Sequence, residues 1–178
     1  MPATARRERG VTLTECCVSI AIAAVMVMVA LPAFSDILEK RHLEGRASEL
    51  SADLQLLRTE AVARNVVARI TVSSDSRGDC YVLHTGDASE CQCNGEAAAT
   101  CEAGAQPIKS VFFPAAGPVR LTADPPSTGI APVRGNAISM NTFVLRDAQG
   151  REVRHVISTL GRVRSCATSP SLSRYAPC

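Results

Sequence analysis

The stretch that decides the organisation of this chain is VTLTECCVSIAIAAVMVMVALPAF, residues 11–34. It contains 24 residues, and Glu15 is the only one that carries a formal charge. A helix needs about 20 predominantly apolar residues to cross the hydrocarbon layer of a bilayer, so the stretch predicts a transmembrane helix. Three arginines lie just before it, within residues 6–9. Because cationic flanks stay on the cytoplasmic side of a membrane, the chain from residue 35 onward is expected outside the cytoplasm.

Three details distinguish this stretch from a cleaved secretion signal. Gly10, the small residue that offers a cleavage point, precedes the apolar run, whereas a secretory signal is cut beyond its apolar region. Glu15 lies near the start of the run, and a lone carboxylate in lipid costs at least a few kcal/mol, so such a residue is rarely idle. Pro32 lies late in the run, where it would bend or loosen a helix.

Together these residues resemble the N-terminus of type IV pilins and of the pseudopilins of type II secretion. In that resemblance Glu15 is the fifth residue of the mature chain and Pro32 is the twenty-second. The resemblance implies that a prepilin peptidase cuts after Gly10, that the new terminus at Val11 is N-methylated, and that Glu15 pairs with the terminal amine of a neighbouring subunit. The first mature residue of these proteins is usually Phe, and here it is Val11. The alternative interpretation is a plain signal-anchor helix with an incidental glutamate.

The helical pattern continues beyond the apolar run. Six apolar residues recur at spacings of 4, 3, 4, 3 and 4, which is one stripe of a helix with 3.6 residues per turn. Charged residues lie between them, and Asn65 marks the expected end, so the helix is expected from about residue 12 to residue 64. We interpret the stripe as a face that packs on a core. It consists of Leu43, Ala47, Leu50, Leu54, Leu57 and Ala61.

From residue 66 the pattern changes to that of strands separated by turns. The clearest hairpin joins residues 137–146 to residues 151–159. Two polar, turn-rich stretches, 86–106 and 124–135, are expected to be loops. Shorter strands are expected at 66–73, 80–84, 111–113, 119–122 and 162–166.

The predicted fold is α+β and pilin-like. A long N-terminal helix, transmembrane in its first half, is expected to pack on an antiparallel β-sheet whose loops are stapled by disulfides. The expected divisions are a leader peptide at residues 1–10, a transmembrane and assembly helix at 11–34, and a periplasmic domain at 35–178.

The charges of the chain are unevenly distributed. Without residues 1–10 the chain is formally neutral. Residues 71–110 carry six acidic groups against two basic ones, whereas residues 125–178 carry seven arginines against two acidic groups. Such an asymmetry favours an anionic partner for the basic part.

Cysteine use indicates an oxidising compartment for most of the chain. Cys16 and Cys17 lie in the apolar run and are expected to be buried thiols. Six cysteines in a small exported domain indicate disulfides, for which fifteen pairings exist. One assignment joins Cys166 to Cys178 at the C-terminus. It leaves four to staple the acidic loop: Cys80, Cys91, Cys93 and Cys101. Zinc is the alternative, but the C-x-C at 91–93 lacks the paired C-x2-C spacing of zinc sites, and we expect no metal and no cofactor.

Two further stretches resemble the GspH/FimT subgroup of this superfamily. LRTEAVARN, residues 57–65, is followed directly by a strand and resembles the end of the subgroup's helix, and STLGRVRSC, residues 158–166, resembles its C-terminus. In the FimT branch, a Gly-Arg-x-Arg segment is associated with the binding of incoming DNA during natural transformation. Carried over, that segment falls on Gly161, Arg162 and Arg164.

A basic patch is the candidate DNA site. Arg162 and Arg164 are two residues apart, so both point to one face of a strand, and arginine forks bind phosphate well. Arg151, Arg154 and His155 on the preceding strand extend the patch. Because aromatic residues for base stacking are few, any contact should be with the phosphates of duplex DNA, without sequence preference. The alternative is a turn glycine followed by two solvated arginines that keep a sheet edge from aggregating.

Catalysis has little support in the sequence. His42, His84 and His155 have no Ser or Cys nucleophile at motif spacing, and there is no G-x-S-x-G, H-E-x-x-H or phosphate-loop motif. The resemblance implies instead a structural subunit of a type IV pilus or a type II secretion filament, whose partners are other pilins, the prepilin peptidase and the inner membrane. A DNA-binding adaptor at the tip of a transformation pilus is the second hypothesis. The alternative is a type II secretion pseudopilin that acts in protein export and binds no DNA.

Overall fold

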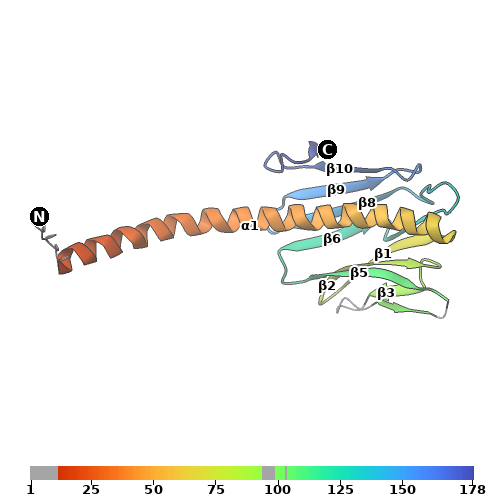
Figure 1. Ribbon diagram of the computed structural model, residues 1–178, viewed down its shortest axis with the longest axis horizontal. Helices are drawn as coiled ribbons and strands as arrows, with labels where there is room; N and C mark the ends of the chain where they lie inside the picture. Colours follow the sequence, from red (N-terminus) through yellow and green to blue (C-terminus); the bar gives the residue numbers. More distant parts are fainter. Residues whose placement is uncertain (1–11, 94–98, 103) are drawn as a thin grey trace, which may run out of the picture. The chain divides into compact units, whose positions relative to one another are not determined.

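The computed structural model describes residues 12–93, 99–102 and 104–178, without the side chains of residues 29–33 (Figure 1). The expected processing site at Gly10 and Val11 lies outside the described residues, and so does the side chain of Pro32. The chain divides into two compact units, Met1–Leu38 and Glu39–Cys178.

One helix, α1, runs from Leu13 to Arg64, close to the expected bounds. The hydroxyl of Thr12 accepts the N–H of Glu15 at 3.3 Å and so satisfies one of the free donors at the start of the helix. Within the part of the chain that the structure describes, α1 contains no stretch that is both long and apolar enough to span a membrane. Its described side chains in the first unit are exposed, and large apolar ones are frequent among them: Leu13, Val18, Ile20, Ile22, Val25, Met26, Val27, Met28, Phe34, Ile37 and Leu38.

The second half of α1 lies across two sheets and packs on them through one face (Figure 1). The six residues of the predicted stripe, from Leu43 to Ala61, are each at most 2% exposed, so the prediction of a packed face is confirmed. Each buried leucine of the stripe contributes about 1.5–3 kcal/mol. The helix ends where Asn65 adopts a left-handed φ of 53°. Val66 then donates its N–H to the carbonyl of Ala61 at 3.2 Å, which satisfies a carbonyl of the last turn.

The two sheets have the strand orders β5-β2-β1-β7 and β11-β10-β9-β8-β6. Neighbouring strands run antiparallel, except that β10 and β11 run parallel. The strands of the first sheet are β1 (Ala68–Asp75), β2 (Gly78–Thr85), β5 (Pro107–Pro114) and β7 (Ser127–Ile130). Those of the second are β6 (Val119–Asp124), β8 (Asn141–Asp147), β9 (Glu152–Ile157), β10 (Val163–Ala167) and β11 (Ala176–Pro177).

Both stretches that were expected to be loops contain strands. The first holds a two-stranded sheet of β3 (Cys91–Cys93) and β4 (Ala99–Cys101). The second holds β7, which pairs with β1 although the two segments are far apart in the sequence. Such a pairing has no local signature in a stretch rich in proline, and so the loop prediction was wrong there.

Disulfides close the loops as one of the considered assignments predicted. The pairs are Cys80–Cys93, Cys91–Cys101 and Cys166–Cys178, with sequence separations of 13, 10 and 12 residues. Loops of this size gain about 3 kcal/mol from closure in the chain-entropy picture. The pair at the C-terminus holds β11 beside β10, and the other two staple the acidic stretch.

Candidate functional site

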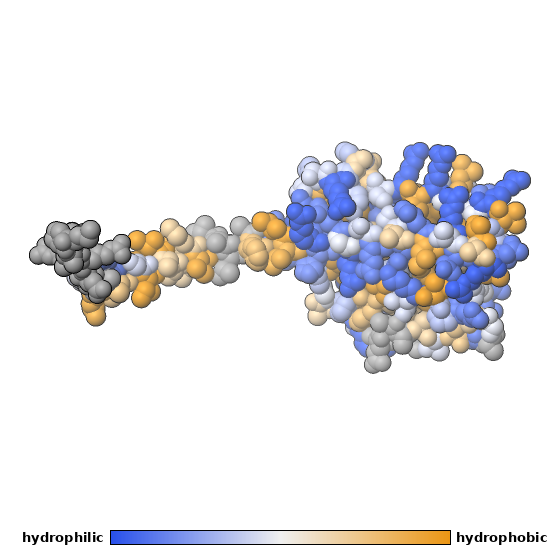
Figure 2. Space-filling view, viewed as in Figure 1, coloured by the Kyte–Doolittle hydropathy of each residue, from blue (hydrophilic) through white to orange (hydrophobic). Residues whose placement is uncertain are grey.

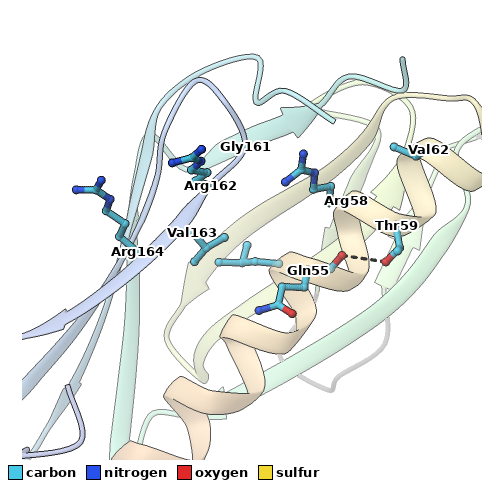
Figure 3. Close-up of a pocket in the computed structure, with 9 residues that line it drawn as sticks. Gln55, Arg58, Thr59, Val62, Gly161, Arg162, Val163 and Arg164 are labelled. Atoms are coloured by element: carbon cyan, nitrogen blue, oxygen red, sulfur yellow. Dashed lines mark hydrogen bonds between the residues drawn. The ribbon is translucent and has the colours of Figure 1, made fainter. Parts of the chain in front are cut away.

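A groove of about 510 Å³ lies between the last turns of α1 and the start of β10 (Figure 3). Leu54, only 2% exposed, forms its floor, and the half-buried Val163 points toward the helix from the strand side. The lining is completed by the helix residues Gln55, Arg58, Thr59 and Val62 and by Gly161, Arg162 and Arg164. The groove therefore combines an apolar floor with a rim that carries three arginines.

Gly161 is required by the turn that leads into β10. Its N–H donates to the carbonyl of Ser158 at 2.8 Å, and the N–H of Ser158 donates to the carbonyl of Arg162 at 3.0 Å. This is a three-residue hairpin turn, which needs a left-handed residue at its last position, and Gly161 has a φ of 72°. A Cβ at this position would also collide with the carbonyl of Gly135.

Gly135 brings the helix into the same site. It also has a left-handed φ, 63°, and a Cβ on it would lie 2.6 Å from Nε of Arg58. The Arg58 side chain therefore lies against the backbone of Gly135, which itself contacts the turn at Gly161. These two contacts place Arg58 of α1 beside the Gly-Arg-Val-Arg segment. The spacing of residues in the sequence could not reveal this arrangement.

Three arginines of the groove have no carboxylate partner in the part of the chain that the structure describes. Among the described residues, Arg58, Arg162 and Arg164 form no ion pair, and all three are exposed. Figure 2 shows hydrophilic side chains projecting along the edge of the molecule where β10 lies. Unpaired guanidinium groups keep their full capacity to bind an anion, and they do so most strongly in bidentate contacts.

Other arginines of the predicted patch are engaged elsewhere. Arg154 donates to Glu152 at 2.8 Å, and the same carboxylate accepts Arg146. The hydrogen bond from Arg154, followed by that from Arg146, lowers the pKa of Glu152. Arg151 is buried and pairs with Asp147 at 2.5 Å. The structure thus brings Gly161, Arg162 and Arg164 into the groove but leaves Arg154 outside it, neutralised on the neighbouring strand.

His155 does not extend the basic surface either. It is fully buried, and its Nδ1 lies 2.7 Å from the hydroxyl of Ser165. Burial lowers its pKa to about 4, so the imidazole is neutral near pH 7. Among the described side chains, no group of His, Cys, Asp and Glu could hold a metal ion.

The chain is similar to one known protein family and to one solved fold. The sequence model of a family described as type II transport protein GspH matches residues 46–161. The crystal structure of the type IV minor pilin FimU of Pseudomonas aeruginosa (strain PAO1) superposes with a TM-score of 0.51 at 20% identity, covering 71% of this chain and 89% of that chain. A second crystal form of FimU gives a TM-score of 0.49 at 20% identity, covering 68% and 90%. No curated protein matches. At this identity the likeness to FimU shows a shared fold.

Proposed function

The chain belongs to the pilin-like GspH/FimT family, and from this premise we propose that it is a minor pilin or pseudopilin subunit of a type IV pilus or type II secretion filament. The observation that carries the proposal is the family match over residues 46–161, which covers most of the domain from Glu39 onward. In this proposal a prepilin peptidase removes residues 1–10, the inner membrane holds residues 11–34, and the domain from residue 35 lies in the periplasm.

The exposed apolar side chains of α1 support burial of this segment in lipid or between subunits. Residues such as Leu13, Ile20 and Met28 are 82%, 69% and 75% exposed in the isolated chain. Soluble monomers rarely leave contiguous apolar patches of more than a few hundred Å² uncovered. Glu15 lies among these residues, and a neighbouring subunit's terminal amine would compensate its charge.

The test of processing is mass spectrometry of the protein isolated from cells. The proposal expects a chain that begins at N-methylated Val11. An intact leader, or a cut beyond the apolar run, would contradict it. The same measurement separates a processed pilin from a plain signal-anchor protein, which would keep its leader.

A second candidate function is binding of duplex DNA through phosphates. The specific observation that favours it is the set of arginines on the groove that form no ion pair within the described ranges. Arg162 and Arg164, with Arg58 beside them, would contact phosphate oxygens without reading the bases. The alternative is a secretion pseudopilin that binds no DNA and acts in protein export.

A gel shift with the full chain in detergent tests DNA binding. Each phosphate neutralised gives a salt slope of about −0.9, so the double variant Arg162→Ala, Arg164→Ala should reduce the slope by nearly 2 and weaken binding. The double variant Arg77→Ala, Arg174→Ala removes the same charge from exposed positions outside the groove and is the control. Equal affinity of the two variants would reject this site, and absence of any shift would favour the secretion alternative.

A further inference from the structure

Within the described ranges, part of one edge of β10 has no neighbouring strand. Hydrogen bonds from Ser158 to Arg162 and from Thr168 to Glu152 fix the pairing of β9 with β10. In this register Arg164 exchanges bonds with β9, whereas Val163 and Ser165 direct their N–H and C=O groups to the opposite edge. Over the described chain, β11 covers that edge only at Cys166 and Ala167.

The two faces of this edge differ in chemistry. On the inner face, Val163 points toward α1 and the groove (Figure 3), whose lining includes Leu54. On the outer face, Arg162 and Arg164 are exposed and have no ion-pair partner among the described residues. A strand added beside β10 would place its own side chains alternately on these two faces. A matching strand therefore alternates apolar residues, directed inward, with acidic residues, directed outward.

We propose that the edge of β10 binds an extended acidic segment of a partner protein as an additional strand. Main-chain bonds to Val163 and Ser165 would supply affinity, the groove floor would receive apolar side chains, and Arg162 and Arg164 would select carboxylates. The groove volume of about 510 Å³ is large enough for several side chains. DNA phosphates need neither an apolar floor nor an open backbone edge, so these two features favour a polypeptide. This inference adds a partner site to the filament role and does not depend on DNA binding.

Synthetic peptides test the chemistry of the segment. The probe is a fluorescent peptide of about eight residues, an ordinary strand length, that alternates Glu and Val. The comparison peptide alternates Lys and Val. Fluorescence anisotropy with the full chain in detergent, disulfides intact, should show at least about tenfold tighter binding of the Glu peptide, which corresponds to about 1.4 kcal/mol. Equal affinity of the two peptides would overturn the proposal.

Two methylated forms of the probe test the backbone contact. The N–H groups of a strand point alternately to its two edges, so methylation of every Val nitrogen or of every Glu nitrogen blocks one edge. One methylated peptide should bind at least about tenfold more weakly than the probe, and the other should bind as the probe does. If both methylated peptides behave alike, no strand is added and the proposal fails.

A matched pair of variants places the peptide in the groove. Thr59→Trp fills the groove from α1 and should weaken binding of the Glu peptide, whereas Ala63→Trp, exposed on the same helix but outside the groove, should not. Equal effects of the two variants would contradict the assignment. If duplex DNA binds through Arg162 and Arg164 while the Glu peptide does not bind, these arginines serve phosphates and the proposal is overturned.

Discussion

The hydroxyl of Tyr81 on β2 donates a 2.5 Å hydrogen bond to the carboxylate of Asp53 on α1. Asp53 also contacts the ammonium of Lys109 at 2.8 Å, and Lys109 reaches Glu49 at 3.2 Å. Burial, assisted by Asp53, raises the pKa of Tyr81 far above its ordinary value, so the hydroxyl remains a donor. This polar network links α1 to the first sheet and fixes the position of the helix along the strands.

Removal of this hydroxyl is expected to destabilise the domain. Tyr81→Phe leaves the buried Asp53 carboxylate with one partner fewer, and the free energy of unfolding should fall by about 1–3 kcal/mol. Urea unfolding followed by circular dichroism measures this change. The control is Tyr175→Phe, because Tyr175 is half-buried and its hydroxyl has no hydrogen-bond partner among the described residues. Similar losses of unfolding free energy in the two variants would show that the hydrogen bond from Tyr81 to Asp53 does not stabilise the domain.

Gly161 should tolerate substitution less well than another glycine of the same conformation. Gly161→Ala combines a left-handed φ with a collision against Gly135, whereas Gly150 has a φ of 77° but open space around a Cβ. Backbone strain alone costs about 1 kcal/mol or somewhat more, so Gly150→Ala should show that loss and Gly161→Ala a larger one. Thermal unfolding of both variants checks the order. Equal melting temperatures would contradict the packing of the turn on Gly135.

The stability of the domain should decrease in moderately acidic solution because of His155. Its pKa is lowered in the folded state, so between about pH 6.5 and about pH 4 the unfolded chain binds a proton that the folded chain does not. The free energy of unfolding therefore decreases as the pH falls through this window. The total decrease is roughly 3 kcal/mol, since one pKa unit corresponds to about 1.4 kcal/mol. Burial lowers the pKa of His84 as well, which adds in the same direction.

The variant His155→Gln isolates this contribution. The difference in unfolding free energy between the natural chain and the variant should shrink as the pH falls from 6.5 toward 4, because only the natural chain loses stability by protonation at this position. Urea unfolding over a series of pH values measures the difference. A difference that is constant with pH would mean that His155 is not the titrating group.

Glu15→Ala is expected to yield a subunit that is inserted and processed but does not join filaments. An unpaired Glu15 carboxylate is costly in lipid, so its pairing with a neighbour's terminal amine would favour the assembled filament over the free subunit. Sheared filaments analysed for the subunit measure incorporation, and mass spectrometry confirms processing. Glu15→Gln, which keeps the size and removes the charge, should behave as Glu15→Ala does. Normal incorporation of either variant would contradict the pairing.

Several features were predictable because they depend on residues close together in the sequence. The stripe from Leu43 to Ala61 follows helical periodicity, and Asn65 ends the helix in a conformation that asparagine tolerates. The hairpin of β8 and β9 was also visible, although β8 begins at Asn141, four residues later than expected. Six cysteines beyond the apolar run indicated disulfides, but spacing alone left their pairing open.

The sequence alone determined the extent of α1 and most of the strands, and it placed Arg162 and Arg164 on one face, because these properties arise from the repeat of a single element. It did not indicate β3, β4 or β7, which lie in the two stretches that were expected to be loops. Only the tertiary structure decided which charges remain unpaired. Lys109 on β5 pairs with Asp53 on α1, while Arg58 approaches the turn at Gly161 through Gly135. Such neighbours are chosen by the packing of the whole core, in which contacts between distant segments form together, and no local pattern records them.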